Sequence, residues 1–284
     1  MSGFLDHLAD RIRAQGWNTF SVAAVEGDGA VQSVELINTN PCQDVYSLAK
    51  AYTMTAIGML YDRGLLTPDT RIVDIFQKEL PAGTADEWSL CTVDMALRHR
   101  LGLPGGFLDI DCTPSTEFGE DFLSYLFRTP LVYTPDTDCK YSDGAYYLLA
   151  RIVDQLSGMH MDDFLWQELF LKQGVLEAAM SHCPQGHPIG ATGLYIRSAD
   201  LVKLGQLYLR GGVYNGTRLL SEEWIRLALE RDYCFEWDET HSVYFKGGMH
   251  GQKLVIDPAR DRAACMESFG ANGDLFVEFV RDAE

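Results

Sequence analysis

The sequence lacks any regular spacing of its cysteines. Seven cysteines are present, an odd number, and no two stand in C-x-x-C spacing. This pattern argues against a disulfide framework and against a zinc ribbon. His182, Cys183 and His187 stand close together and could bind a metal. The run 181–189 around them is rich in Pro and Gly, which is typical of a loop, so we interpret this cluster as incidental.

Long apolar runs are also missing. No stretch reaches the roughly 20 apolar residues that a helix needs to cross a bilayer. The first 16 residues mix acidic and basic side chains and lack the basic-then-apolar pattern of a secretion signal. We therefore expect no membrane span and a cytoplasmic protein, with an exported form whose signal was removed as the alternative.

Basic residues are few. The chain has 23 Lys and Arg against 41 Asp and Glu, a formal net charge of −18. Such a surface repels phosphate backbones, so we expect no nucleic-acid partner. The motifs H-E-x-x-H, the P-loop and a G-x-G-x-x-G between strand and helix are all absent. These absences give little support to a metal- or nucleotide-dependent enzyme, and we expect no cofactor.

What is present is a globular composition, with 46% apolar residues in 284. Apolar periodicity and turn residues predict helices over 5–13, 46–63, 143–156, 198–209, 221–229 and 274–280, and strands over 20–25, 31–37, 252–256 and 262–268. The order predicts an α/β fold of the α+β type, in which both ends of the chain build an antiparallel sheet around an inserted, mainly helical lobe. We predict one domain over 1–284, with an α/β lobe at about 1–75 and 200–284 and a helical lobe at about 76–199. A cleft between the lobes is a natural place for a site.

The helix that follows Val45 carries the first candidate chemistry. Lys50 is its only charged residue as far as Tyr61, and apolar residues occupy every face, which indicates a buried helix. A buried ammonium without a partner costs several kcal/mol or loses its proton. Ser47 lies three positions earlier on the same face, at the helix start, where a neutral Lys50 could take its proton. The alternative is a chance S-x-x-K in which Ser47 is a helix cap.

Two later segments carry matching chemistry. Tyr141 directly precedes the helix that begins at Asp143, which we place at its N-cap; held near Lys50, Tyr141 could act as a base and later protonate a leaving group. The alternative is a core tyrosine. Further on, the run Lys246-Gly247-Gly248-Met249 leads into a strand, and its glycines allow close approach of a substrate backbone. A backbone N–H there, with that of Ser47, could form an oxyanion hole; the alternative is a glycine-rich hairpin.

These three segments, in this order, resemble the motifs of the serine β-lactamases and penicillin-binding DD-peptidases. Within that family the chain is most similar to the class C branch and its esterase and amide-hydrolase relatives. Ser47-Leu48-Ala49-Lys50 matches S-x-x-K, Tyr141-Ser142-Asp143 stands in place of Y-x-N, and Lys246-Gly247-Gly248 stands in place of K-T-G or H-x-G. Further similarity lies in 97–103, 133–136, 193–216 and 255–258, so the resemblance covers nearly the whole chain from about residue 20.

The resemblance implies a fold and a set of roles. The fold is an antiparallel sheet flanked by N- and C-terminal helices, plus a helical lobe. Ser47 would be the acylated nucleophile, Lys50 and Tyr141 the acid–base pair, and the N–H groups of Ser47 and Met249 the oxyanion hole. The residues that would contact or steer substrate are Asp143, Lys246, Gly247, Gly248 and His250.

Two departures from the family pattern bear on the substrate. Asp143 replaces an Asn amide by a carboxylate, and Gly247 removes a hydroxyl that helps to hold the β-lactam carboxylate. A lost hydrogen bond to a charged group costs roughly 1.5–3 kcal/mol, so we expect β-lactams to be poor substrates. The sequence predicts a serine hydrolase for a small ester, amide or peptide, with a DD-peptidase disfavoured because no export signal is visible. The alternative is a non-catalytic relative that binds a ligand or partner in the cleft. Nothing in the sequence indicates the oligomeric state.

Overall fold

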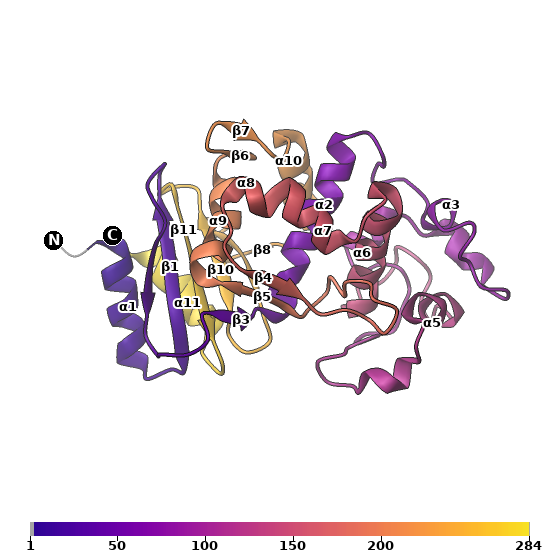
Figure 1. Cartoon of the computed structure of the whole chain (residues 1–284), viewed down its shortest axis with the longest axis horizontal. Helices are drawn as coiled ribbons and strands as arrows, with labels where there is room; N and C mark the ends of the chain where they lie inside the picture. Colours follow the sequence, from indigo (N-terminus) through magenta and orange to yellow (C-terminus); the bar gives the residue numbers. More distant parts are fainter. Residues whose placement is uncertain (1–2, 284) are drawn as a thin grey trace.

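A computed structural model describes residues 3–283 of the chain (Figure 1). Its main feature is a six-stranded antiparallel sheet with the strand order β2-β1-β11-β10-β9-β8. The strands of this sheet are β1 (Thr19–Glu26), β2 (Gln32–Glu35), β8 (Glu236–Trp237), β9 (Tyr244–Gly247), β10 (Lys253–Asp257) and β11 (Arg262–Ser268). The N-terminal hairpin and the C-terminal strands are therefore neighbours, because β1 pairs with both β2 and β11.

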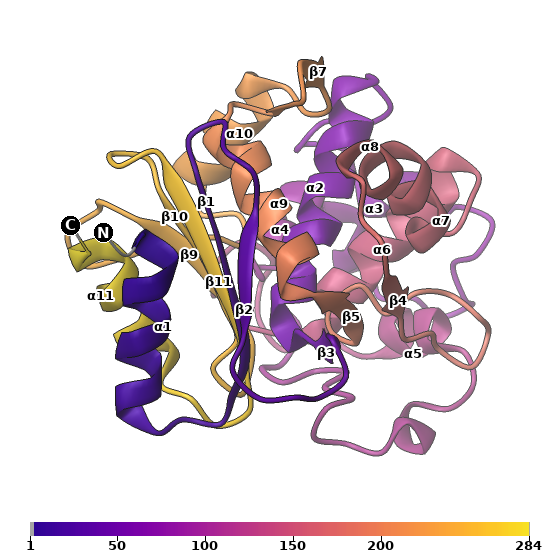
Figure 2. The same ribbon diagram turned by 60° about the vertical axis from the view of Figure 1, so that its left-hand side comes forward.

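Two terminal helices cover one face of the sheet. These are α1 (Phe4–Gln15) and α11 (Gly273–Asp282), which lie together on the same side in Figure 2. Their apolar faces enclose a small core with the sheet, in which Leu8, Ile12 and Phe276 meet Val22 and Val255. Alternation along each strand sends the remaining side chains to the opposite face.

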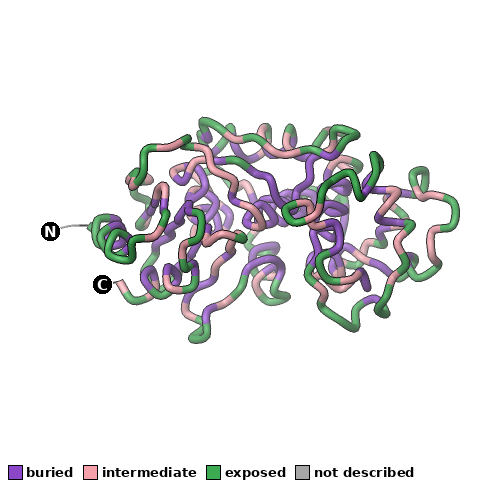
Figure 3. The backbone as a smooth tube through the Cα atoms, turned by 90° about the horizontal axis from the view of Figure 1, so that it is seen from below, coloured by how far each residue is buried: buried purple, intermediate pink, exposed green. Residues whose placement is uncertain are grey.

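The opposite face of the sheet contacts α9 (Ser198–Leu209) and the larger core. Figure 3 shows the buried segments concentrated in the interior of the molecule and the exposed ones on its outer loops. One continuous cluster of buried residues runs from Val25 and Cys265 on the sheet to Phe127 and Phe164 among the distant helices. The helix α2 (Ala49–Asp62) lies within it, and its residues from Ala49 to Leu60 are all buried.

The rest of the chain is mainly helical. The helices are α3 (Ile72–Ile75), α4 (Val93–Leu97), α5 (Phe122–Arg128), α6 (Asp143–Ser157), α7 (Met161–Leu165), α8 (Leu171–Gln173) and α10 (Glu222–Glu230), with a π-helical turn η4 (Trp166–Phe170) and 3-10 turns η1 (Tyr46–Leu48), η2 (Asp86–Leu90) and η3 (Ser115–Phe118). Two further small sheets are formed by β3 (Cys42–Asp44), β4 (Ala178–Met180) and β5 (Leu194–Arg197), and by β6 (Val213–Tyr214) and β7 (Thr217–Arg218).

The predicted fold class is confirmed, and so is the position of each predicted helix and strand to within a few residues. One detail is wrong: the N-cap of α6 is Ser142, whose Oγ accepts from Ala145 N, and Asp143 is the first helical residue. Because the cap is one residue earlier, the Asp143 side chain is free to point elsewhere. Among the described residues, no helix is both long and apolar enough to cross a membrane. The proposed division into lobes remains a prediction.

Candidate active site

Ser47 lies in a tight turn between strand β3 and helix α2. Val45 N donates to the Leu194 carbonyl, and Tyr46 N donates to the Asp44 carboxylate over 2.8 Å. Tyr46 itself has a φ of 49°, a left-handed conformation that costs free energy in a non-glycine residue. These two bonds hold the turn on its strand side, and the turn presents the half-buried Ser47 beside the first turn of α2.

Lys50 is fully buried one helical turn later, with an exposed fraction of 0%. Its Nζ lies 3.0 Å from Ser47 Oγ, 2.7 Å from Asp143 Oδ1 and 2.8 Å from the Ala191 carbonyl oxygen. An ammonium has three N–H donors, and here each of them has an acceptor. Lys50 is therefore paired with Asp143, whereas the sequence suggested a buried lysine without a partner.

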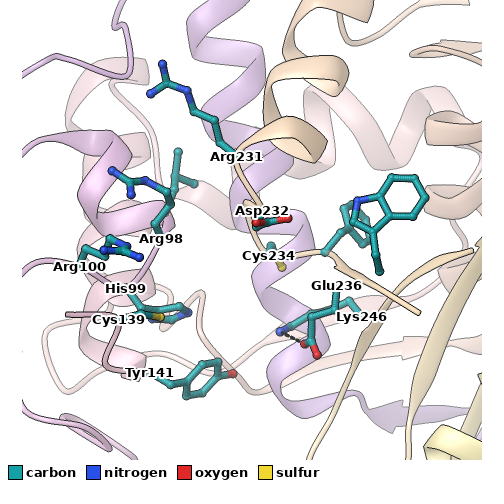
Figure 4. Close-up of a pocket in the computed structure, with 13 residues that line it drawn as sticks. Arg98, His99, Arg100, Cys139, Tyr141, Arg231, Asp232, Cys234, Glu236 and Lys246 are labelled. Carbon is teal, nitrogen blue, oxygen red and sulfur yellow. Dashed lines mark hydrogen bonds and ion pairs between the residues drawn. The ribbon is translucent and has the colours of Figure 1, made fainter. Parts of the chain in front are cut away.

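Tyr141 contacts the same serine from the segment that leads into helix α6. Its Oη lies 2.7 Å from Ser47 Oγ, and the residue as a whole is 44% exposed. The Lys50 and Lys246 ammonium groups lie 4.7 and 5.6 Å from the centroid of the Tyr141 ring. Figure 4 shows Tyr141 and Lys246 on facing sides of one pocket.

The His99 ring packs against the Tyr141 ring. The two rings are 4.5 Å apart, and His99 Nδ1 accepts a hydrogen bond from Ser142 N over 3.3 Å. Burial, followed by the charges of Lys50 and Lys246, lowers the pKa of His99 to about 3. The imidazole is therefore neutral near pH 7, with its proton on Nε2, since Nδ1 is an acceptor. His99 positions Tyr141 without adding charge to the site.

Lys246 comes from strand β9. Only 6% of the residue is exposed, and its Nζ pairs with Glu236 Oε1 over 3.3 Å. Burial opposes the charge, but Cys234, Tyr141 and Glu236 outweigh it, and the pKa of Lys246 is raised. A side chain added at Gly247 would lie against Lys253, because its Cβ would stand 3.0 Å from Lys253 Cδ.

Gly248 is required by the protein's own packing. A Cβ there would clash with the Val45 carbonyl oxygen, so the end of β9 packs directly against the turn that carries Ser47. The absence of a side chain at Gly248 therefore allows the backbone before Ser47 to pack against the end of β9. The sequence suggested instead that this glycine leaves room for a substrate backbone.

Met249 and His250 follow in the next turn. Met249 is 49% exposed, and its N–H makes no hydrogen bond to any residue within 3–283. The His250 ring stacks on Phe269 at 4.0 Å and meets Tyr46 edge-on at 4.9 Å. His250 thus contacts the turn beside the serine through Tyr46.

Within residues 3–283, two clusters of acidic and histidine side chains could hold a metal ion. In one, oxygens of Asp109, Asp111 and Asp143 lie within 4.8 Å of one another. Asp143 already binds Lys50, and Thr192 Oγ1 donates to Asp111 over 2.7 Å. Burial raises the pKa of Asp111, with neighbouring carboxylates adding to the effect.

The other cluster lies on the helical part of the chain. It joins Asp154, His160 and His187, with His187 Nδ1 2.7 Å from Asp154 Oδ2. Of the histidines singled out in the sequence, His182 pairs separately with Asp162 over 2.9 Å. The groups in this region that could hold a metal are therefore already engaged with one another.

The structure brings Ser47, Lys50, Tyr141, Asp143 and Lys246 together. Sequence reasoning missed the placement of His99 behind Tyr141 and the carbonyl of Ala191 as the third acceptor of Lys50. The resemblance of residues 97–103 to a stretch of the family included His99 but implied no role for it. No local pattern marks Ala191, because its carbonyl oxygen accepts from Lys50, which lies 141 residues earlier in the chain.

The fold has an antiparallel sheet, and a serine hydroxyl near it contacts a buried lysine and a tyrosine. Together these features define the class of the β-lactamase-fold hydrolases. A family model described as Beta-lactamase matches residues 6–274. The chain belongs to that family.

Individual relatives agree with this assignment. The chain is 30% identical over 240 residues to Penicillin-binding protein 4 of Amycolatopsis lactamdurans, covering 73% of this chain and 61% of the relative. It is 23% identical over 257 residues to 6-aminohexanoate-dimer hydrolase of Paenarthrobacter ureafaciens, covering 76% and 63% of the two chains. The chain thus spans less than two thirds of either curated relative.

A solved structure shares the fold along the full chain. A penicillin-binding protein homologue from Caulobacter crescentus superposes with a TM-score of 0.76 at 17% identity, over 99% of this chain and 95% of that one. This likeness concerns the fold alone.

Proposed function

We propose that this protein hydrolyses an ester or amide through an acyl-enzyme on Ser47, with Tyr141 as the group that exchanges protons and Lys50 as the cation that assists it. One observation carries the proposal: Ser47 Oγ lies within 3.0 Å of Lys50 Nζ and 2.7 Å of Tyr141 Oη. A nucleophile within hydrogen-bond reach of its proton acceptor, which is in turn oriented by a third group, is the arrangement that activates a serine. Here His99 is that orienting group.

The contacts favour different roles for Lys50 and Tyr141. Lys50 has an acceptor for each of its three N–H groups, so it acts as a fixed cation beside Ser47. Tyr141 acts as a phenolate whose proton has been released to solvent, and the ammonium groups of Lys50 and Lys246 stabilise its charge. Tyr141 Oη accepts the serine proton while Oγ bonds to the substrate carbonyl carbon, and the negative charge passes to the carbonyl oxygen.

The remaining steps use the same groups. The bond from the carbonyl carbon to the leaving oxygen or nitrogen breaks, and Tyr141 returns its proton to that atom. A water then attacks the acyl group and gives its proton to Tyr141, and Tyr141 passes that proton to Ser47 Oγ as the bond from Oγ to the acyl carbon breaks. We assign the N–H groups of Ser47 and Met249 to the carbonyl oxygen; the unengaged N–H of Met249 supports this.

The substrate class that fits is a small ester, amide or peptide. One relative is named for the hydrolysis of 6-aminohexanoate dimer and another as a penicillin-binding protein. We propose that penicillins and cephalosporins are turned over poorly, because Asp143 and Gly247 remove groups that the family uses. Steady-state kinetics with one drug of each kind tests this; efficient turnover of either contradicts it.

The acyl-enzyme is tested with a fluorophosphonate probe followed by intact mass. We expect one adduct on the wild type, none on Ser47→Ala, and an unchanged adduct on Ser33→Ala, a control at an exposed serine of β2. An unlabelled wild type would favour the non-catalytic alternative, in which the cleft only binds a ligand.

A further inference from the structure

Three side chains that can ligate a metal ion meet at the far end of helix α6 from Tyr141. Asp154 lies in the last turn of α6, His160 is the N-cap of α7, and His187 lies in the loop 181–189. Helices α6 and α7 contact each other and lie side by side in Figure 1. One nitrogen or oxygen atom from each of the three side chains lies within 4.8 Å of the other two.

The two oxygens of the Asp154 carboxylate have different surroundings. Oδ1 accepts a hydrogen bond from Met161 N over 2.7 Å, which fixes the orientation of the carboxylate. Oδ2 lies 2.7 Å from His187 Nδ1 and 3.5 Å from His160 Nδ1, and only 9% of the Asp154 side chain is exposed. Carboxylates that bind metal ions are oriented in this way by an outer hydrogen bond. Asp154 thus presents one free oxygen to two imidazoles.

The two histidines differ in how firmly they are held. The His187 carbonyl oxygen accepts from Cys183 N over 2.8 Å, and His182 and Pro188 form a β-bridge that closes the loop into a tight turn. The His160 ring meets the His187 ring edge-on, with centroids 4.9 Å apart, and 46% of the His160 side chain is exposed. His187 is therefore placed by its loop, while His160 has room to adjust.

The distances suit a small tetrahedral ion. Zn²⁺ binds histidine nitrogen and carboxylate oxygen at roughly 2.0–2.2 Å, which places neighbouring ligand atoms about 3.4 Å apart. The 3.5 Å between Asp154 Oδ2 and His160 Nδ1 agrees with this spacing. The contact of Asp154 with His187 would lengthen by about 0.7 Å through a side-chain rotation. The only hydrogen bond lost is one between two of the ligands themselves.

The charges around the cluster favour a cation. Arg151 Nε lies 3.5 Å from Asp154 Oδ2, and another nitrogen of the same guanidinium lies 3.5 Å from Glu79 Oε2. Two carboxylates therefore surround one guanidinium, and the excess charge is negative. Because the net charge of the whole chain is −18, the surrounding surface also attracts cations.

We infer that Asp154, His160 and His187 bind one Zn²⁺ ion, with water in the fourth position. Two imidazoles and a carboxylate are a ligand set that zinc accepts. The site does not depend on the proposed function, because its ligands make no hydrogen bond to Ser47, Lys50 or Tyr141.

The ion would connect three parts of the fold. It joins the end of α6 to the start of α7 and to the loop 181–189. The chain leaves this loop through Gly190 and Ala191, whose carbonyl oxygens accept from Thr53 and Lys50 of helix α2 at 2.7 and 2.8 Å. Bound zinc therefore stabilises the folded state by holding this segment between α6 and α2.

Calorimetric titration of the chelator-treated full chain with ZnCl₂ tests the inference. We expect one equivalent to bind to the wild type. Removal of an outer-shell partner alone typically weakens a metal site about 10- to 100-fold, so His160→Gln and His187→Gln should each weaken binding by at least about tenfold. His182→Gln is the matched control, because this histidine lies in the same loop but pairs with Asp162. It should leave the affinity unchanged.

A spectrum of the Co²⁺-loaded protein distinguishes this site from binding at a thiol, since Cys112 and Cys139 are exposed. We expect visible d–d bands without the near-ultraviolet sulfur-to-cobalt charge-transfer band of a cysteine ligand. Zn²⁺ at a hundred times its Kd should raise the melting temperature of the wild type by about 5 °C.

His160→Gln should melt at the wild-type temperature without metal and gain no stability from zinc. A wild type that binds no zinc would overturn the inference. So would equal affinities in the wild type and His160→Gln, or a sulfur-to-cobalt band.

Discussion

The Asp143 carboxylate is the anionic partner of a lysine that has no contact with water. Only 0% and 6% of the Lys50 and Asp143 side chains are exposed. Removing one partner of such a pair leaves a buried charge uncompensated, which typically costs about 3–5 kcal/mol. We expect Asp143→Ala to lower the free energy of unfolding by about that amount.

Asp143→Asn is the matched variant. Its amide oxygen can still accept from Lys50 Nζ, so we expect a smaller loss of about 1–2 kcal/mol. Urea denaturation of both variants measures the two costs. Equal losses would mean that the charge of Asp143, rather than its role as acceptor, holds Lys50 in place.

Glu267 makes the stability depend on pH. Burial raises its pKa from the ordinary 4.5 to about 8, and only Ser21 donates to it among the described residues. Because the folded state holds the proton more tightly, the unfolded state ionises first as pH rises. The contribution of Glu267 to stability is full below pH 4.5 and is lost as pH rises toward 8, by about 1.4 kcal/mol per pH unit.

Glu267→Gln removes this titration. We expect the free energy of unfolding of the variant, relative to that of the wild type at the same pH, to rise between pH 5 and pH 8. A constant difference across that range would show that Glu267 ionises at similar pH in both states.

At the scale of single elements, the start of helix α6 connects local stability to the site. Ser142 caps this helix, and its neighbours Tyr141 and Asp143 both reach the Ser47–Lys50 pair. Ser221 caps α10 in the same manner, with its Oγ accepting from Trp224 N. Loss of either cap should cost about 1 kcal/mol.

The two caps should differ in their effect on activity. Fraying of α6 moves Tyr141, and small misplacements of a catalytic group are costly, so Ser142→Ala should also lower kcat/KM about tenfold. Ser221→Ala should leave kcat/KM unchanged. Urea denaturation and hydrolysis assays on both variants make the comparison, and a similar loss of activity in both would contradict the link.

Elements defined by local patterns were predictable from the sequence, and those defined by distant contacts were not. Strand β11 and helix α9 were predicted with the residues they have, and strands β1 and β2 were predicted to within a few residues. The two-residue strand β8 is too short to alternate, and β4 forms only because β5 lies beside it.

The same distinction applies to the site. Ser47 and Lys50 are neighbours on one helix, so their spacing predicts their contact. Tyr141 and Asp143 could be placed beside them only through the family resemblance, because the chain that separates them carries no local signal. The hydrogen bonds of Arg100 to a loop near residue 136 also depend on tertiary structure.

For the whole molecule, the continuous core predicts a single unfolding transition. Helix α2 is buried on all sides, and the same cluster of apolar residues joins the sheet to the helical part of the chain. The second buried cluster, between the sheet and helices α1 and α11, contacts the same sheet. We therefore expect residues 3–283 to unfold as one unit.

Fluorine NMR with 5-fluorotryptophan tests this prediction. Trp17 stacks on Phe279 beneath the sheet, and Trp88 packs against Phe127 among the helices, so the two resonances report on opposite ends of the molecule. Trp17→Phe and Trp88→Phe assign the signals. Coincident urea midpoints are expected, and two distinct midpoints would indicate lobes that unfold separately.

The positions of the cysteines give a way to observe the cleft that Tyr141 and Lys246 line. Cys139 is exposed on its wall, two residues before Tyr141, whereas Cys91, Cys183, Cys234 and Cys265 are buried. Burial, followed by the charge of Glu177, raises the pKa of the half-buried Cys42 to about 11, which makes it slow to alkylate. After Cys112→Ser, a maleimide dye would attach at Cys139. Its emission would follow the filling and emptying of the cleft in real time, with or without turnover.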